Sequence, residues 1–264
     1  MAKNLKDVVI VGAVRTPIGK YKGIWAKHQA HELGAKVILN ILNKTKISSA
    51  DIDEVIMGQV LTGGTGQNPA RQAAIKAGLP IDKTAYIINQ VCGSGLRAVA
   101  AGYQSILTND SNIVIAGGQE SMTNSKEEMM LKDGLVDAYN KYHMGITAEN
   151  VAEKFGISRK DQDKFAASSQ LKTQEAIKKG KFKEEIIEGD VTLDEHPRSQ
   201  ITEESLSKLK TVFKENGTVT PGNASGINDG AAFVILMSDS KARELGLSSK
   251  ASVVSSVSVG CDPS

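Results

Sequence analysis

The sequence predicts an α/β fold with a polar insertion. Over the first 118 residues, short β-branched apolar runs alternate with segments of helical periodicity, which is typical of a largely parallel sheet covered by helices. Residues 119–226 are mostly polar and rich in lysine and glutamate, and the pattern of a buried strand returns after them. We therefore expect an α/β domain formed by 1–118 and 227–248, an inserted loop domain at 119–226, and the first strand of a second domain at 249–264.

The elements can be assigned in order from local patterns. Runs rich in valine and isoleucine predict strands at 8–11, 55–61, 85–91, 113–116, 231–237 and 251–259. Helical spacing of apolar residues predicts helices at 33–42, 69–77, 96–107 and 241–245. Asn68 and Pro69 supply an N-cap and a first-turn proline, and Gly78 ends that helix. Ser158 opens a further helix with a capping box in which an aspartate replaces the usual glutamate, and the lysines of 172–183 are expected on its solvated face.

Composition and charge exclude several classes of protein. With 32 basic and 30 acidic side chains in 264 residues, the net charge of +2 gives no electrostatic footprint for nucleic acid. No apolar run approaches the length that crosses a bilayer, and the run at 8–11 fits a buried strand better than a signal peptide. The two cysteines, Cys92 and Cys261, exclude a disulfide scaffold and suit a reducing cytoplasm. We expect a cytoplasmic protein without nucleic-acid or membrane partners.

The stretch NQVCGSGLRAVAAG, at 89–102, carries the strongest chemical signal. Cys92 lies between a predicted strand and the N-terminus of a predicted helix, where the helix dipole and free N–H groups stabilise negative charge on sulfur. Gly93 and Gly95 allow a tight turn and close approach of a substrate to backbone N–H groups that could bind an oxyanion. This context predicts an acyl-transfer nucleophile, and it is equally consistent with a cysteine that is simply a small buried apolar residue.

Two other readings of these patterns compete with acyl transfer. The sequence from Gly93 to Ala98 fits G-x-G-x-x-A, and Glu120 lies near the end of the next strand, as in dinucleotide-binding proteins. That fingerprint belongs on the first βαβ unit, whereas this stretch follows the third strand. His28 and His31 could share one helix face and bind a metal, but no third ligand is suggested, so no metal site is expected.

Three further segments have the composition of ligand-binding loops. His143 and Met144 lie in the compact segment YHMGITAEN, and Arg198 follows a proline in a polar loop where it could meet a phosphate. Residues 220–230 are almost all small or polar and cannot build a core, so they predict a shaped loop of the kind that lines a site.

These segments together resemble the thiolases. NQVCGSGLRA, GGQESM, HMGITAENVAEKFGISRKDQD and TVTPGNASGINDGAA, with VRTPIG near the start, are similar to motifs of that family, and most similar to those of its biosynthetic acetyl-CoA C-acetyltransferases. The resemblance implies a five-layer αβαβα fold with two similar α/β halves and a loop domain inserted in the first. It also implies the reaction of two acetyl-CoA to acetoacetyl-CoA and coenzyme A, with coenzyme A thioesters as substrates and no separate cofactor.

By the same resemblance, Cys92 is the nucleophile that takes the acyl group. His143 and Met144 would lie against the pantetheine part of coenzyme A. Further positions that match the coenzyme A site of the family are Arg198, Ser205, Phe213, Ala224 and Ser225.

The sequence also departs from the family pattern. It contains no N-E-A-F, G-H-P or C-x-G-G-G motif, which carry the asparagine, the histidine and the second reactive cysteine, and Cys261 is not in such a context. We expect a chain that ends as the second half begins and does not complete the reaction alone. A homodimer or a complementary C-terminal half would be its partner. The segment 123–142 is shorter than in members of the family, and the missing part resembles the loop by which those enzymes join dimers into tetramers.

Three questions stay open at this point. A non-catalytic acyl-CoA-binding protein or a decayed fragment is the first alternative function, and a dinucleotide-binding oxidoreductase is the second. The sequence leaves open the acyl-chain preference and whether the reaction runs in the biosynthetic or the degradative direction.

Overall fold

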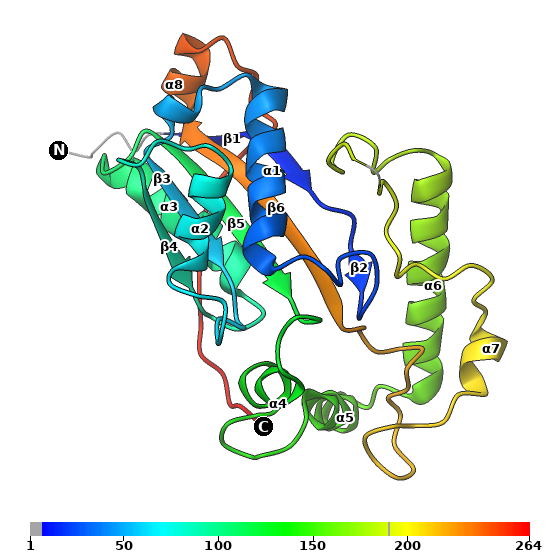
Figure 1. The fold of residues 1–264 in the computed structure, drawn as a ribbon. Coiled ribbons are helices and arrows are strands. Elements are labelled where there is room, and N and C mark those ends of the chain that lie inside the picture. Colours follow the sequence, from blue (N-terminus) through cyan, green and yellow to red (C-terminus); the bar gives the residue numbers. More distant parts are fainter. Residues whose placement is uncertain (1–6, 190) are drawn as a thin grey trace.

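One mixed β-sheet organises the molecule (Figure 1). The computed structural model describes residues 7–189 and 191–264. The strands lie in the order β4-β3-β5-β6-β1-β7, with β2 beside β6. Their bounds are β1 (Val8–Arg15), β2 (Gly19–Lys20), β3 (Glu54–Gly58), β4 (Thr84–Ile88), β5 (Ile113–Ser121), β6 (Asn228–Ser238) and β7 (Ala251–Ser252).

The prediction of a largely parallel sheet is only partly right. Strands β4, β3 and β5 are parallel neighbours, whereas β6 runs antiparallel to both β5 and β1. The reason lies in the insertion: Ser121 at the end of β5 pairs with Asp229 at the start of β6, so the chain leaves and re-enters the sheet at the same edge. Since β1 and β5 both oppose β6, the two run in the same direction and their carboxyl ends lie at one edge with those of β3 and β4.

Helices cover both faces of this sheet (Figure 1). Helices α1 (Ala30–Thr45) and α2 (Pro69–Lys76) bury their apolar residues in one core, where Leu33, Ile38 and Ile41 have no exposed surface. Helix α3 (Ser94–Thr108) covers the opposite face and packs Ala98 and Ile106 on it. Helix α8 (Asp239–Glu244) follows β6. The N-cap at Asn68 is confirmed, because its side chain accepts a hydrogen bond from the Arg71 N–H.

The insertion forms a separate group of helices beside the sheet (Figure 1). It holds α4 (Glu127–Met129), a π-helical turn at Met130–Leu135, α5 (Met144–Phe155), α6 (Arg159–Lys178) and α7 (Glu203–Ser207). The capping box at Ser158 is confirmed in both directions with Asp161. The lysines of 172–183 are exposed as predicted, but α6 ends at Lys178, so Lys179, Lys181 and Lys183 lie beyond the helix. Within the part of the chain that the structure describes, no helix is both long and apolar enough to cross a membrane.

The strand expected at 251–259 is wrong beyond Ser252. Strand β7 pairs only with Val9 and Ile10 of β1. The side chains of Val254, Val257 and Val259 are exposed. A β-branched run favours extended backbone, but only a hydrogen-bonded neighbour makes it a strand. The last bond to β1 is from the Val253 N–H to the Val8 carbonyl at 2.9 Å, and the described residues after it pair with no strand.

Glycine backbone lets the start of α3 approach the sheet closely. A Cβ on Gly58, at the end of β3, would lie 2.4 Å from the Gly95 nitrogen and from the Ser94 carbonyl carbon. Gly118 of β5 completes this contact, since a Cβ there would lie 3.4 Å from the Cα of Gly95. The first residues of α3 therefore pack directly on the backbone of β3 and β5, and this close contact requires glycine at positions 58 and 118.

Replacing Gly58 by alanine is expected to destabilise the protein by roughly 1–3 kcal/mol, because a methyl group there must displace the first turn of α3. Urea unfolding measures this change in free energy. The matched control is Gly63→Ala, where the new Cβ would make an ordinary contact of 3.4 Å with the Met129 side chain. Equal stability of the two variants would contradict the packing argument.

Candidate active site

Cys92 lies on the turn between β4 and α3. Strand β4 ends at Ile88, Gly93 is the N-cap of α3, and the helix begins at Ser94. The side chain of Cys92 is exposed. This corrects the alternative in which Cys92 is a buried apolar residue, and it places the sulfur near the positive end of a 15-residue helix, where negative charge is stabilised.

The tight turn before α3 does not use the glycine that the sequence suggests. Gly93 has an ordinary φ of −82°, and the left-handed residue is Val91, with a φ of 48°. Among the described non-glycine residues with positive φ, Val91 is the one with a β-branched side chain. Such a conformation is strained, costs on the order of 1–3 kcal/mol, and persists only where surrounding contacts impose it.

Ser94 supplies those contacts. Its hydroxyl donates to the Val91 carbonyl at 2.5 Å and accepts from the Gln90 N–H at 2.8 Å, and its own N–H also donates to the Val91 carbonyl. Asn89 holds the other side of the turn by accepting the Val91 N–H at 3.0 Å. Ser94 is 3% exposed, so its own bonds are partly shielded from water, whereas the Asn89 bond is exposed. Together these bonds hold the backbone of Val91, next to Cys92, in its left-handed conformation.

Of the two glycines expected to bind an oxyanion, Gly93 has its N–H occupied within the turn and Gly95 remains a candidate. The N–H of Gly93 donates to the Gln90 carbonyl at 3.1 Å, so the turn itself occupies it. Gly95 belongs to the first turn of α3 and packs on Gly118. An oxyanion contact from Gly95 stays a prediction.

Glu120 has a structural task at the same edge of the sheet. Its carboxylate accepts the N–H of Val60 at 2.8 Å and that of Leu61 at 3.4 Å, which anchors the loop after β3. Burial raises the pKa of Glu120, and the nearby Asp229 adds to the rise, although the backbone hydrogen bonds oppose it. Because the loop backbone occupies this carboxylate, Glu120 does not serve as the ribose-binding acid that a dinucleotide site requires.

His143 and Phe213 form a stacked pair in the insertion. His143 is the N-cap of α5, and its Nδ1 accepts the Gly145 N–H at 3.0 Å, which leaves the ring proton on Nε2. The rings of His143 and Phe213 are 4.7 Å apart and inclined by 18°. Gly145 makes this stacking possible, because a Cβ there would fall 2.2 Å from the Phe213 ring. Met144, next to the pair, is exposed.

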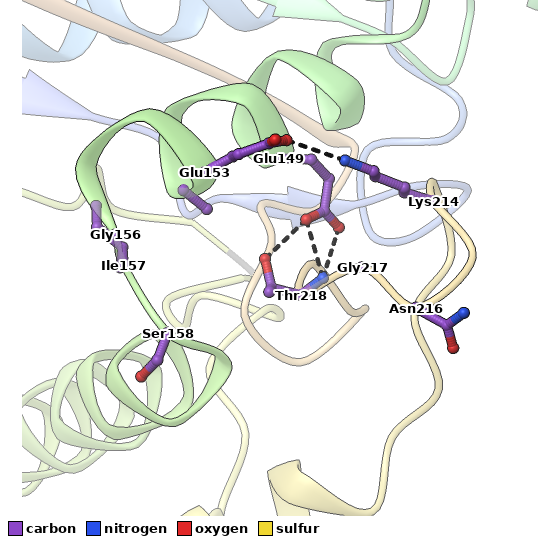
Figure 2. Close-up of a pocket in the computed structure, with 10 residues that line it drawn as sticks. Glu149, Glu153, Gly156, Ile157, Ser158, Lys214, Asn216, Gly217 and Thr218 are labelled. Carbon is purple, nitrogen blue, oxygen red and sulfur yellow. Dashed lines mark hydrogen bonds and ion pairs between the residues drawn. The ribbon is translucent and has the colours of Figure 1, made fainter.

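A buried carboxylate fixes the loop that carries Phe213 (Figure 2). Glu149 of α5 accepts the Thr218 N–H, the Thr218 hydroxyl and the Val219 N–H, all at 2.8–2.9 Å. Burial alone would raise the pKa of Glu149, but these hydrogen bonds outweigh it and hold the pKa below its ordinary value. The Glu153–Lys214 ion pair closes the same small pocket at its rim.

The motifs near residues 18, 196 and 225 meet around one cavity of about 320 Å³. Its wall includes Arg198, Ala224 and Ser225, three of the positions that the sequence assigned to coenzyme A. The Arg198 N–H is held by the Gln170 side chain at 2.9 Å. His196 fills the space above Gly226, where a Cβ would lie 1.7 Å from its Nε2. Three further residues line this wall without having been predicted: Gln170, Asp194 and His196. Asp194 and His196 lie within four residues of Arg198 in the sequence, which was their only signal, and Gln170 of α6 had none.

The other predicted residues lie outside this cavity. Cys92, His143, Met144 and Phe213 do not line it, and Ser205 forms a reciprocal capping box with Thr202 at the start of α7. Cys261 is exposed in the segment after β7. His28 lies edge-on against Trp25 before α1, and His31 lies on α1. In 7–189 and 191–264, no group of three or more potential ligand side chains is placed to hold a metal ion.

The fold and this arrangement of motifs define a thiolase-like α/β protein. The family model described as "Thiolase, N-terminal domain" matches residues 8–129 and 124–240. An acetyl-CoA acetyltransferase of Pseudomonas aeruginosa is 49% identical over 98% of this chain and 73% of its own, and one of Chromobacterium violaceum is 50% identical over 97% and 72%. The crystal structure of the Bacillus anthracis acetyl-CoA acetyltransferase superposes with a TM-score of 0.89, covering 95% of this chain and 70% of that one at 36% identity.

The chain therefore belongs to the thiolase family, as the resemblance implied. Membership in this family rules out the alternative of a dinucleotide-binding oxidoreductase. The G-x-G-x-x-A match, from Gly93 to Ala98, is part of the thiolase motif that contains Cys92.

Replacing Val91 by glycine is expected to leave the protein at least as stable as the wild type. Glycine adopts a positive φ freely, which offsets its extra entropy in the unfolded chain, and the half-exposed valine loses little burial. Ser94→Ala, by contrast, is expected to cost about 1–3 kcal/mol because it leaves buried partners unpaired. Thermal unfolding of the two variants measures both effects. A Val91→Gly variant less stable than wild type by more than about 1 kcal/mol would contradict strain at this residue.

Glu149 is expected to stabilise the fold in a pH-dependent way. Because its pKa is lowered on folding, its contribution is fully present above the unfolded value of about 4.3 and is lost as the pH falls through the lower folded pKa. The difference in unfolding free energy between wild type and Glu149→Gln should therefore be largest near neutral pH and shrink below about pH 4. Chemical denaturation at several pH values tests this, with the exposed Glu153→Gln as the matched control. A difference that grew on acidification would overturn the assignment.

Proposed function

We propose that this chain performs acyl transfer as an acetyl-CoA C-acetyltransferase, with Cys92 taking the acetyl group as a thioester. One observation carries the proposal: an exposed cysteine opens α3 in a chain that is 49% identical to an acetyl-CoA acetyltransferase over 98% of its length. The substrate class is that of the acetyl-CoA acetyltransferases to which the chain is similar, and the position of the sulfur fits that chemistry.

In the proposed step, the Cys92 sulfur attacks the carbonyl carbon of acetyl-CoA. A new C–S bond forms, the bond to the coenzyme A sulfur breaks, and coenzyme A leaves as the thiol with the proton that Cys92 gives up. Negative charge develops on the carbonyl oxygen during the attack, and we propose that N–H groups of the first turn of α3, with Gly95, stabilise it. Because Ser94 holds the backbone at Val91, the backbone that carries Cys92 does not have to be ordered during the reaction.

Coenzyme A binding is proposed for the insertion and the 220–230 loop. The exposed guanidinium of Arg198 supplies a positive charge for a phosphate group, and Ala224 and Ser225 form the adjoining wall of the cavity. His143 and Met144 would contact the pantetheine arm. Phe213 would hold the His143 ring in position by stacking on it. Ser205, in the first turn of α7, is proposed as a further coenzyme A contact.

Condensation of the acetyl-enzyme with a second acetyl-CoA requires a base that removes an α-proton. In the family this base and the second cysteine belong to the G-H-P and C-x-G-G-G motifs, which the printed sequence does not contain. We propose that the residues present here supply the first step, and that a complementary chain supplies the base and the second cysteine for condensation. Self-association as a homodimer is a separate part of the proposal, because a second copy of this sequence brings neither residue. A cytoplasmic location is part of the same proposal.

Incubation with acetyl-CoA is expected to add one acetyl group to Cys92, as detected by intact-mass analysis and peptide mapping. The Cys92→Ser variant should lose the label, whereas Cys261→Ser, which removes the other exposed thiol, should keep it. Labelling that survives Cys92→Ser, or equal labelling of Cys261, would contradict the proposal. Binding of coenzyme A without any labelling would instead support the non-catalytic acyl-CoA-binding alternative.

A further inference from the structure

We propose that Arg15, at the end of β1, is a positioning residue for the coenzyme A cavity. It holds, through Asp194, the segment that carries His196 and Arg198. This inference rests on the proposed function, because the cavity is taken as the coenzyme A site. Arg15 itself is not on the cavity wall, so it acts through other residues.

The backbone of Arg15 is joined to a segment far away in the sequence. Its N–H donates to the Glu185 carbonyl at 2.7 Å, and its carbonyl accepts the Ile187 N–H at 2.9 Å. These two bonds form an isolated parallel bridge at Ile186. The insertion is therefore fastened to the end of β1 immediately before the chain turns toward the cavity.

The Arg15 side chain adds ion pairs to this backbone connection. Its guanidinium makes two hydrogen bonds to the Asp194 carboxylate, at 2.7 and 3.0 Å, and a third to Glu185 at 2.7 Å. The ring of Phe182 lies 5.4 Å from the guanidinium carbon. The Arg15 side chain is 17% exposed and that of Asp194 10%, so solvent screens this pair only weakly.

Asp194 transmits the restraint to the cavity. Besides the two bonds from Arg15, its Oδ1 accepts the Ile18 N–H at 2.7 Å, and both Asp194 and Ile18 line the cavity. Glu195 repeats the connection, since its N–H donates to the Ile18 carbonyl at 3.0 Å. The wall formed by residues 194–198 is thus fixed against the wall formed by the VRTPIG motif.

Loss of the guanidinium would release this wall and leave its carboxylate without a partner. Burial raises the pKa of Asp194, but the bonds from Arg15 and Ile18 outweigh it and hold the pKa below its ordinary value. Without Arg15, a partly buried carboxylate would have to move toward water, taking the neighbouring His196 and Arg198 with it. The expected defect is therefore in ligand affinity, and the chemistry at Cys92 should remain, because Cys92 lies on the separate turn before α3.

Calorimetric titration with coenzyme A, together with single-turnover acetylation of Cys92 at increasing acetyl-CoA, tests the proposal. Arg15→Gln should weaken coenzyme A binding about tenfold or more and raise the half-saturating acetyl-CoA concentration equally, with an unchanged maximal acetylation rate. Arg15→Lys should restore the affinity only in part, because an ammonium cannot make the paired contact with Asp194. Asp194→Asn should reproduce the loss, and the double variant should add little to either single change. Arg243→Gln, which breaks an exposed ion pair on α8, is the matched control and should bind like wild type.

The outcomes separate this inference from the proposed function. Wild-type protein that neither binds coenzyme A nor becomes acetylated would overturn both. If the wild type binds coenzyme A and Arg15→Gln binds it with the same affinity, the positioning role alone is overturned. The same holds if Arg15→Gln loses coenzyme A affinity and maximal acetylation rate to the same extent. If Arg15→Gln does not fold, Asp194→Asn and Arg15→Lys decide the question by the same measurements.

Discussion

Strand β6 is hydrogen-bonded along both edges, to β5 on one side and to β1 on the other. It joins residues more than a hundred positions apart, because the whole insertion lies between β5 and β6. The pairing of Ser121 with Asp229 closes the insertion at its base. Because β6 opposes both β5 and β1, it places the carboxyl end of β1 at the same edge as those of β3, β4 and β5, so the position of the cavity relative to the Cys92 turn depends on the register of this strand.

Local signals in the sequence predict local structure well. The Asn68 cap and the Ser158 capping box were predictable because their partners lie within three residues. The direction of β6 was not, since it depends on where the insertion returns to the sheet. The strand expected at 251–259 failed for a related reason: valine propensity is visible in the sequence, but the presence of a neighbouring strand is not.

The candidate site shows the same limit at the level of single residues. The motif around Cys92 was sufficient to propose a nucleophile, and the two glycines suggested a tight turn. The actual left-handed residue is Val91, held by Ser94, and no propensity rule assigns that conformation to a valine. Arg15 was part of a motif that carried the resemblance, yet its contact with Asp194 spans 179 positions and only the folded chain brings them together.

The strand order gives the two parts of the site a spatial relation. Cys92 follows β4 and the cavity adjoins the end of β1, and both strands end at the same edge of the sheet. The order β4-β3-β5-β6-β1 separates strands β4 and β1 by four strand spacings, or roughly 19 Å at about 4.8 Å each, and the cavity also reaches Asn228 at the start of β6. A ligand that places a phosphate near Arg198 and a thioester at Cys92 must therefore be long and lie along this edge, which suits the pantetheine arm of coenzyme A. His143 and Met144, at the start of α5, belong to the insertion that leaves the sheet at that edge, and under the proposed function they would contact the arm.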